Sequence, residues 1–351
     1  MRSQIPIQNV YYLFCYAWNR FPEGSPLAVG AADCPDIANL LARVLLNGLR
    51  RLRRRGLTRA YLDREEELRS VRGKILIDQT IRRNLVGRSQ AVCEFDDLDH
   101  DCPPNQIIKA TARQLAFCVD IDSGLSNELK ATCRDLSQIS DVRLSARSFK
   151  TVRLSRNQAH YDLVMKVCQL AFECALPEEG GKNSRFADVL NDQAKMPAVF
   201  EEFVRNFYKA DLSDFSVSRT QIPWRATAAN NADLAYLPTM NTDVTLRSKS
   251  RTVILDAKFY RETLSTFRQN EKIWSSNLYQ LFSYLKNADT EDHPGLPEGI
   301  LLYPTVQADL DLRFNLSGHD IRVSTVNLND NWRSIHKRLL SIVEGDRVGT
   351  A

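Results

Sequence analysis

The sequence predicts a mixed α/β protein with two domains, and three observations lead to this expectation. The chain has 351 residues, which is long for a single domain and suits two compact ones. Hydrophobic residues make up 43% of the chain and charged residues 26%, as in an ordinary globular protein. In the second half, helical and strand-like apolar patterns follow one another as they do in a sheet covered by helices.

Residues 1–150 are expected to form an N-terminal mixed α+β domain. Three stretches carry apolar residues at helical spacing, namely residues 10–18, 36–52 and 104–119. The stretches "VRGKILID" and "QAVCEFDDLD", within residues 71–99, are expected to be short strands, because Gly73 and Gly87 punctuate them. Polar helix and turn residues follow. The domain boundary is expected in the basic and polar stretch at residues 145–157.

Residues 151–351 are expected to form an α/β domain with a central mixed sheet. After a helix at 160–176 and a turn-rich break, the pattern is helix, three strands, helix, two strands and a closing helix. The helices are expected to start near Pro197, near residue 270 and in "NWRSIHKRLLSIVE". The strands are expected in "FSVSRTQIPW" and at residues 242–247, 252–260, 299–305 and 321–328.

The arginine cluster at residues 50–55 has two interpretations. It ends the second predicted helix, where positive charge suits the helix dipole. Five arginines in six residues exceed what a helix end needs, so a patch for phosphate or an acidic partner is the other interpretation. The net charge of +4 is too small to indicate a nucleic-acid binder by itself.

The cysteines and the lengths of the apolar stretches indicate the cellular compartment. The eight cysteines include no CxxC pair and no neighbouring His at zinc-finger spacing, so they are expected to be reduced and structural. A zinc site built from distant cysteines is the alternative. No stretch approaches the ~20 apolar residues of a membrane helix. We therefore expect a cytoplasmic protein without a membrane segment or a secretory signal.

The stretch "TVILDAKFY", residues 252–260, sets two charges into an apolar strand. Side chains alternate along a strand, so Asp256 and Lys258 share one face while Ala257 occupies the other. Antiparallel pairing of this strand with the preceding one would bring Asp243 close to Asp256. Two adjacent carboxylates repel each other unless a cation lies between them, and Mg²⁺ suits hard oxygen ligands. With a lysine beside it, this pattern fits metal-dependent hydrolysis of a phosphodiester.

Three further side chains extend the pattern. Glu201 lies on the predicted helix before the sheet, although Glu202 is an equal candidate there. Gln280 and Tyr284 lie one helical turn apart and therefore on one helix face. Each of these residues alone is an ordinary surface or helix residue. Their order along the chain, on the expected kinds of element, is far more specific than any one of them.

This order resembles the PD-(D/E)xK nuclease superfamily, and the Gln-x-x-x-Tyr helix resembles its RecB-like branch. The leading Pro of the motif is replaced by Thr242. A closer resemblance, to the McrC subunit of the McrBC modification-dependent restriction system, covers nearly the whole chain. The stretches that carry it are "IPIQNVYYLFCYAWN", "VRGKILIDQTI", "NQIIKAT", "TDVTLRS", "ILDAKFY", "NLYQLFSYL" and "GILLYP".

The resemblance implies a restriction-endonuclease-like fold in the second domain and a DNA endonuclease that uses Mg²⁺, with Mn²⁺ as a substitute. The implied metal ligands are Asp243, Asp256, the backbone carbonyl of Ala257 and, as an auxiliary ligand, Glu201. Lys258 would position or activate the attacking water. Gln280 would orient Lys258 or the water, and Tyr284 would contact phosphate or support Gln280.

The resemblance also implies partners. The N-terminal domain would dock on an McrB-like AAA+ ring and stimulate its GTPase, and the nuclease domain would cut double-stranded DNA carrying a modified base of the 5-methylcytosine type. Nuclease domains would pair to cut both strands, in defence against foreign DNA such as that of viruses. The chain has no GxxxxGK[ST] loop, because "GGKN" at residues 180–183 lacks the earlier Gly and the hydroxyl residue, so no nucleotide is expected to bind through a P-loop.

Two other functions fit the same residues. One is a non-catalytic adaptor that activates an AAA+ ring, and the other is a stand-alone RecB-like nuclease. The candidate residues for docking on a ring are Arg50 to Arg55, Arg72, Lys74, Asn105 and Lys109.

Overall fold

The chain folds into two compact units whose boundary differs from the expected one. The computed structural model describes residues 5–19, 34–177, 184–186, 195–260, 273–288, 295–306 and 309–344. One unit, here called the helical unit, spans Pro35–Ala187. The other, here called the sheet unit, combines Met1–Cys34 with Asp188–Ala351.

The expected division between residues 150 and 151 was wrong because long-range contacts override chain order. Helix α1 (Ile7–Ala17) packs against α9 (Lys195–Asp211), and the Asn9 side chain donates to the carbonyls of Leu328 and Asp330. These contacts place the N-terminal helix in the sheet unit. Helix α8 (Asp162–Cys174) packs instead on α3 (Ile37–Arg55), which extends the helical unit past residue 150.

The helical unit is a cluster of helices with a small sheet. Asp36 caps α3 by accepting from the Asn39 N–H, and Gly56 follows it with a positive φ of 88°. The remaining helices are α5 (Pro103–Ala116), α6 (Ser123–Asp135) and the short α7 (Ala146–Thr151), with 3₁₀ turns η2 (Val86–Arg88) and η3 (Arg156–Tyr161). A two-stranded pair, β4 (Ala175–Pro177) and β5 (Ser184–Phe186), completes it.

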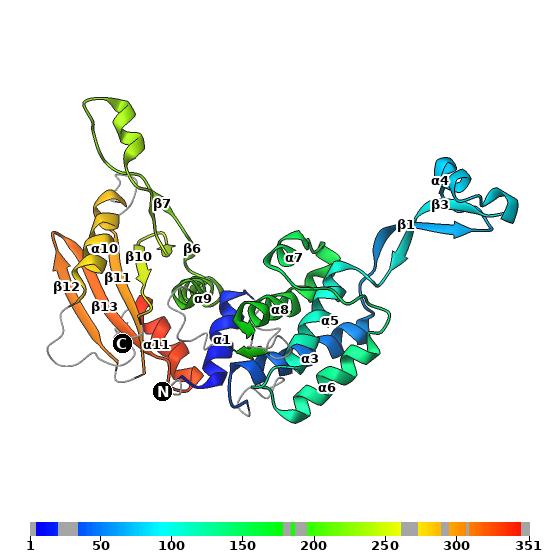
Figure 1. Cartoon of the computed structure of the whole chain (residues 1–351). Helices are drawn as coiled ribbons and strands as arrows, with labels where there is room; N and C mark the ends of the chain where they lie inside the picture. Colours follow the sequence, from blue (N-terminus) through cyan, green and yellow to red (C-terminus); the bar gives the residue numbers. More distant parts are fainter. Residues whose placement is uncertain are drawn as a thin grey trace. The chain divides into compact units, whose positions relative to one another are not determined.

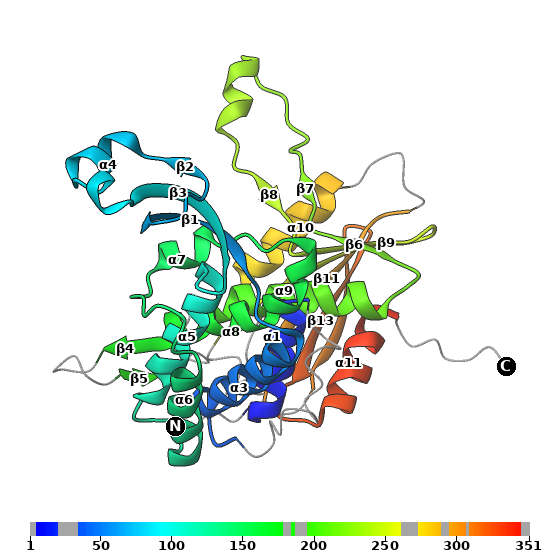
Figure 2. The ribbon, with the colours of Figure 1, turned by 90° about the vertical axis from the view of Figure 1, so that its right-hand side faces the viewer.

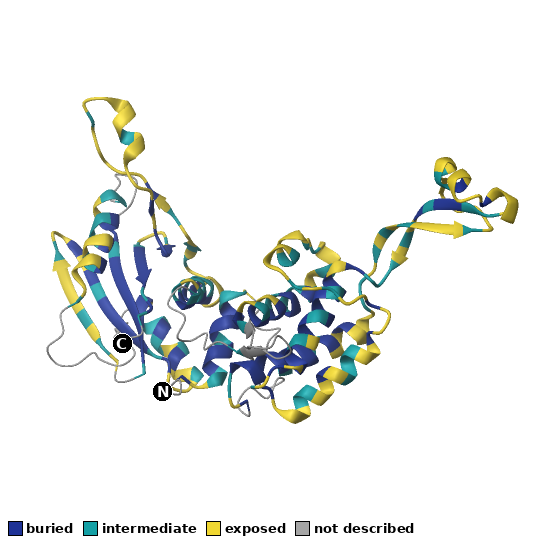
Figure 3. Cartoon of the chain, in the orientation of Figure 1, coloured by how far each residue is buried: buried dark blue, intermediate teal, exposed yellow. Residues whose placement is uncertain are grey.

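The small sheet has the order β1-β3-β2 and is antiparallel. Its strands are β1 (Ala60–Leu68), β3 (Ala91–Asp99) and β2 (Lys74–Ile75), followed by helix α4 (Ile77–Arg82). The strand expected over "VRGKILID" is therefore only partly formed. Its end turns into α4, where the Thr80 hydroxyl donates to Leu76 O and accepts from Val92 N. Strand β1 is largely exposed (Figure 3), so its sequence shows no apolar face.

The sheet unit is built on a mixed six-stranded sheet, which confirms the predicted fold class (Figure 1). The strand order is β12-β13-β11-β10-β9-β6. Strands β10, β11 and β13 are parallel, and the other three pair antiparallel at the two sides. The bounds are β6 (Ser216–Ser218), β9 (Val244–Arg247), β10 (Thr252–Ala257), β11 (Glu298–Thr305), β12 (Asp311–Leu316) and β13 (His319–Asn327).

Helices cover this sheet and bring side chains to the carboxyl end of β10, where the candidate residues lie. Helix α10 (Ser275–Ala288) packs on β10 and β11, and α11 (Trp332–Glu344) packs on β13. Helix α9 lies against β6, β9 and β10. Gly299 allows α10 to approach closely, since a Cβ there would lie 2.8 Å from a methyl group of Leu285.

The single strand expected over "FSVSRTQIPW" is instead divided into β6 and a second short strand, and the residues that follow form an arm. Strands β7 (Gln221–Ile222) and β8 (Met240–Asn241) pair at its base, and η5 (Asn231–Tyr236) lies between them. Ile222 and Met240 are buried in the same core as α10. Figures 1 and 2 both show the arm extending beyond the sheet.

Two further observations concern the state of the cysteines and the possibility of a membrane-spanning helix. All eight cysteines lie in the described residues without a disulfide, and seven are buried. No helix in the described ranges is both long and apolar enough to cross a membrane.

Candidate active site

Strands β9 and β10 bring the two predicted carboxylates together. They pair antiparallel with Leu255 opposite Val244, so Asp256 and Asp243 are neighbours one step further along. The Ala257 N–H donates to Asp243 Oδ2 over 2.9 Å and fixes that side chain against β10. The antiparallel pairing predicted from the sequence is therefore confirmed.

Asp256 is the most unusual polar group in the described part of the sheet unit. Its residue is fully buried, and neither carboxylate oxygen accepts a well-directed hydrogen bond from the described residues. The Lys258 ammonium lies 2.9 Å from Oδ2 and offsets part of the charge. Burial raises the pKa of Asp256 to about 7, the Lys258 charge opposes the rise and the Asp243 charge adds to it. A buried carboxylate without hydrogen bonds is costly unless a cation binds to it.

Asp243 shares this environment. It is 8% exposed, and burial raises its pKa, while the hydrogen bond from Ala257 N and the Lys258 charge lower it in part. Arg205 of α9 donates to the backbone carbonyl of Asp243 over 3.1 Å. The Ala257 N–H of β10 thus holds the carboxylate of Asp243, and Arg205 of α9 holds its backbone carbonyl.

Lys258, Gln280 and Tyr284 form a continuous chain of hydrogen bonds. The Lys258 Nζ donates to Gln280 Oε1 over 2.9 Å, and Gln280 Nε2 donates to the Tyr284 hydroxyl over 2.7 Å. Burial of Lys258 lowers its pKa, but the charges of Asp256 and Asp243 outweigh burial, so the pKa is raised. The ammonium stays charged, and α10 orients it through Gln280.

Glu201 is related to this group of residues through its charge. It lies on α9, and its pKa is raised first by burial and then by the Asp243 charge, while the Lys258 charge lowers it. Its carboxylate is therefore within electrostatic range of the strand residues. Glu202 forms an ion pair with Arg205 instead, so Glu201 rather than Glu202 is the helix carboxylate available to the site.

The donor set fits a hydrated hard cation better than a fully protein-bound metal. The described residues contain no group of three or more His, Cys, Asp or Glu side chains that could hold a metal ion. The oxygens of Asp256, one of which faces the Lys258 ammonium, and the second oxygen of Asp243 remain as ligands, together with the adjacent backbone. Mg²⁺ usually keeps several waters and takes one or two carboxylates from the protein, so these residues suit it.

Sequence reasoning missed several residues around the site. Tyr260 donates to Asn277 Oδ1, and Asn277 Nδ2 donates to the Tyr303 hydroxyl, which ties α10 to β11 beside Lys258. From the sequence, Arg205 could be recognised only as a possible ion-pair partner of Glu202 on the surface of the same helix. The exposed Arg219, which follows β6, gave no signal at all.

Comparisons with known proteins agree on one family. Residues 8–304 match the family model described as McrBC 5-methylcytosine restriction system component. The chain is 31% identical over 340 residues to the Escherichia coli (strain K12) protein called Type IV methyl-directed restriction enzyme EcoKMcrBC, covering 97% of both chains. Its fold is similar to a chain of the Thermococcus gammatolerans half-complex of McrB AAA+ hexamers with bound McrC, with a TM-score of 0.60, 17% identity, and coverage of 97% of this chain and 76% of that one.

Proposed function

Because this chain belongs to the family of McrBC 5-methylcytosine restriction system components, we propose that it is the Mg²⁺-dependent DNA endonuclease subunit of such a system. The observation that carries the proposal is Asp256, a buried carboxylate without a hydrogen bond from the described residues, beside Asp243 and the charged Lys258. A structural ion pair would leave no reason for two adjacent carboxylates to share this position. A site for a divalent cation and a phosphate gives that reason.

The metal would be held by groups on β10, on the segment directly before β9 and on helix α9. Its ligands would be Asp243, Asp256, the backbone carbonyl of Ala257 and, directly or through water, Glu201. When bound, Mg²⁺ supplies charge that neutralises the carboxylates and polarises the scissile phosphate. Mn²⁺ would serve as a substitute.

The other residues act on the water and on the developing charge. Lys258, held by Gln280, would position the attacking water and stabilise negative charge on the phosphate oxygens in the transition state. Tyr284 keeps the Gln280 amide oriented toward Lys258. In-line attack of the water on phosphorus then leaves a 5′-phosphate and a 3′-hydroxyl.

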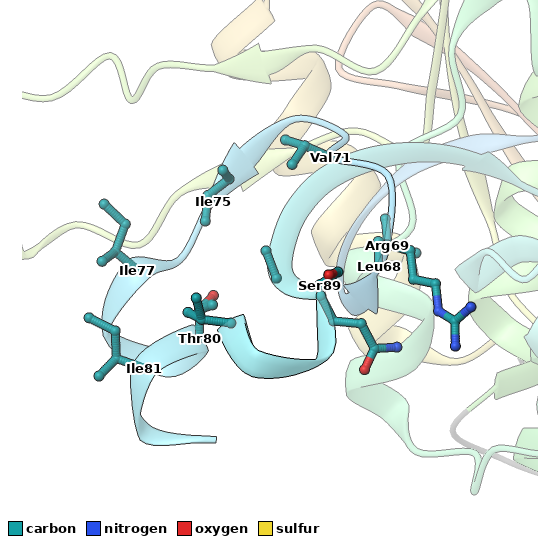
Figure 4. A pocket seen from close by; sticks show the side chains of 11 residues that line it. Leu68, Arg69, Val71, Ile75, Ile77, Thr80, Ile81 and Ser89 are labelled. Atoms are coloured by element: carbon teal, nitrogen blue, oxygen red, sulfur yellow. The ribbon is translucent and has the colours of Figure 1, made fainter. Parts of the chain in front are cut away.

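The helical unit would dock on an McrB-like AAA+ ring and stimulate its GTPase. Exposed apolar side chains gather around α4, where they line an open cavity of about 420 Å³ (Figure 4). Val71, Ile77, Ile81 and Val86 among them are each more than half exposed. Exposed apolar patches of this kind mark interaction sites, so we place the docking surface here.

The docking residues expected from the sequence fit less well. Asn105 and Lys109 are buried, and the Lys109 ammonium donates to Ile139 O inside the helical unit, so neither can contact a partner. Arg50 and Arg53 form ion pairs with Glu128 and Asp135 of α6. Part of the arginine cluster therefore joins α3 to α6 through ion pairs.

Arg72 and Lys74 are engaged within the small sheet. The Arg72 guanidinium lies over the Phe95 ring and pairs with Asp97. Lys74 pairs with Glu94. Both remain exposed at their outer ends, so they can still border the apolar surface.

The proposal is tested by cutting modified plasmid DNA with the full chain, its GTPase partner, GTP and Mg²⁺. Asp256→Ala should abolish cleavage and leave both ring binding and GTPase stimulation intact, because the substitution lies in the sheet unit. The matched control is Asp320→Ala, an exposed carboxylate on β13. Full cutting by Asp256→Ala would refute the nuclease assignment, and cutting without the partner would favour a stand-alone nuclease.

A further inference from the structure

Arg219 lies beside the segment that carries Asp243, and backbone hydrogen bonds hold it there. Strand β6 ends at Ser218, which pairs with Thr245 of β9. On the other side of Arg219, Thr220 exchanges two hydrogen bonds with Thr242, from Thr242 N to Thr220 O over 2.9 Å and from Thr220 N to Thr242 Oγ1 over 3.0 Å. Residue 219 is thus fixed alongside the segment that carries Asp243.

The charge of Arg219 reaches the site. The pKa values of both Glu201 and Asp243 are raised overall by burial, and the Arg219 guanidinium lowers each of them in part. This electrostatic effect agrees with the position of Arg219 alongside the segment that carries Asp243.

Among the residues that the structure describes, no side chain or backbone group occupies the hydrogen-bond donors of Arg219. It is exposed, and no ion pair or hydrogen bond joins its side chain to any residue in the described ranges. Arg205, the other arginine near Asp243, is only 15% exposed and is committed to Glu202 and to the Asp243 carbonyl. A guanidinium presents five N–H donors in a planar fork that matches two oxygens of a phosphate.

We propose that Arg219 is a phosphate-binding residue that holds the DNA backbone at or next to the phosphate being cut. The inference rests on the proposed nuclease function and adds to it a residue outside the carboxylate and lysine set. A DNA phosphate is the ligand that fits, because it brings the negative charge and the paired oxygens that the free guanidinium lacks in this part of the protein. The arm between β7 and β8 begins two residues beyond Arg219, so the bound duplex would lie near the base of the arm.

The test compares Arg219→Ala, Arg219→Lys and Arg247→Ala in the full chain with its GTPase partner, GTP, Mg²⁺ and modified plasmid. Arg247 is the matched control, because it is exposed and lies at the opposite end of β9 from Asp243. Arg219→Ala should slow cleavage by roughly 10- to 100-fold, Arg219→Lys should restore part of the rate, and Arg247→Ala should stay within about two-fold of the wild type.

A second readout separates phosphate binding from an electrostatic or structural role. Binding of a labelled 30-base-pair duplex to the full chain without metal is measured across salt concentrations, and Arg219→Ala should lower the salt dependence by about one phosphate contact. Wild-type cleavage by Arg219→Ala, or a slow Arg219→Ala with an unchanged salt dependence and no recovery in Arg219→Lys, would overturn the inference. If Asp256→Ala cuts as well as wild type, the proposed function itself fails, which is a different result.

Discussion

At the scale of single residues, the site is defined by charges that the fold brings together at a cost. Asp256 on β10 and Asp243 directly before β9 are neighbours, both are buried, and burial raises the pKa of each. The Lys258 ammonium compensates one of the two negative charges. One negative charge is left over in the metal-free protein. Our account assigns it to a divalent cation, and two predictions follow for individual side chains.

The first prediction concerns pH and stability without metal. The folded-state pKa of Asp256, about 7, lies above its ordinary value of 3.8, so the native state binds a proton that the unfolded state has released. Stability from this group is therefore present below about pH 4 and lost as pH rises toward about 7. Asp256→Asn, which cannot ionise, should become more stable than the wild type as pH rises.

Calorimetry in EDTA at about pH 5 and about pH 8 measures this difference. The melting temperature of Asp256→Asn relative to the wild type should increase by several degrees between the two pH values, and about 1 kcal/mol corresponds to roughly 2–4 °C for a unit of this size. Asp320→Asn, at an exposed position, serves as the control. Equal differences at both pH values would show that Asp256 is not a buried carboxyl group with a raised pKa.

The second prediction ranks Lys258 and Gln280. Lys258→Ala removes the cation beside the phosphate and should reduce cleavage by about 1,000-fold or more, whereas Gln280→Ala removes only its support and should cost about 10-fold. Single-turnover cleavage rates with the partner complex decide the order. The roles assigned here are wrong if Gln280→Ala is as inactive as Lys258→Ala.

At the scale of elements, the active-site strands could be predicted from sequence because their charges interrupt buried apolar residues. "VILDAKFY" is apolar on both sides of Asp256, and both strands form within the expected ranges, although β9 begins just after Asp243 and β10 ends just before Lys258. Strand β1 could not be predicted in this way, because it is largely exposed and its charged residues leave no apolar alternation. Strand β12 was also missed, although Leu312, Phe314 and Leu316 alternate there with polar residues. The arm between β7 and β8 was also missed, since its strands are only two residues long.

The packing of α10 on the sheet gives a prediction at this scale. Gly299→Val would place a side chain against Leu281 and Leu285, so α10 must move and carry Gln280 with it. The substitution should destabilise the sheet unit by about 1–3 kcal/mol and also slow cleavage. Urea unfolding measures the loss, and Gly87→Val, where nothing lies within 4 Å of an added Cβ, is the control. Unchanged stability would mean that α10 does not depend on this close approach.

At the scale of the whole molecule, the sequence suggested two domains but not their composition. Helix α1 joins the sheet unit through contacts with residues more than 300 positions away, such as that of Asn9 with Leu328, and no local pattern announces a contact of this kind. For the same reason Arg205 and Arg219 were not found, because only the fold brings them near Asp243.

Docking through the helical unit predicts a separation of activities. Ile77→Asp with Ile81→Asp places charge in the apolar surface around α4 and should weaken ring binding and GTPase stimulation by about 10-fold or more. Unfolding of the sheet unit should be unaffected. Val119→Asp, at an exposed apolar position outside that cavity, is the control. Equal ring binding by both variants would place the docking surface elsewhere.

The central claim is that the buried Asp256, whose carboxylate accepts no well-directed hydrogen bond from the described residues, binds a divalent cation. A titration of the full chain with Mn²⁺, followed by electron paramagnetic resonance, tests it most directly. The account predicts bound Mn²⁺ in the wild type, competition by Mg²⁺, and loss of this binding in both Asp243→Asn and Asp256→Asn but not in Asp320→Asn. Mn²⁺ binding by Asp256→Asn equal to that of the wild type would contradict it.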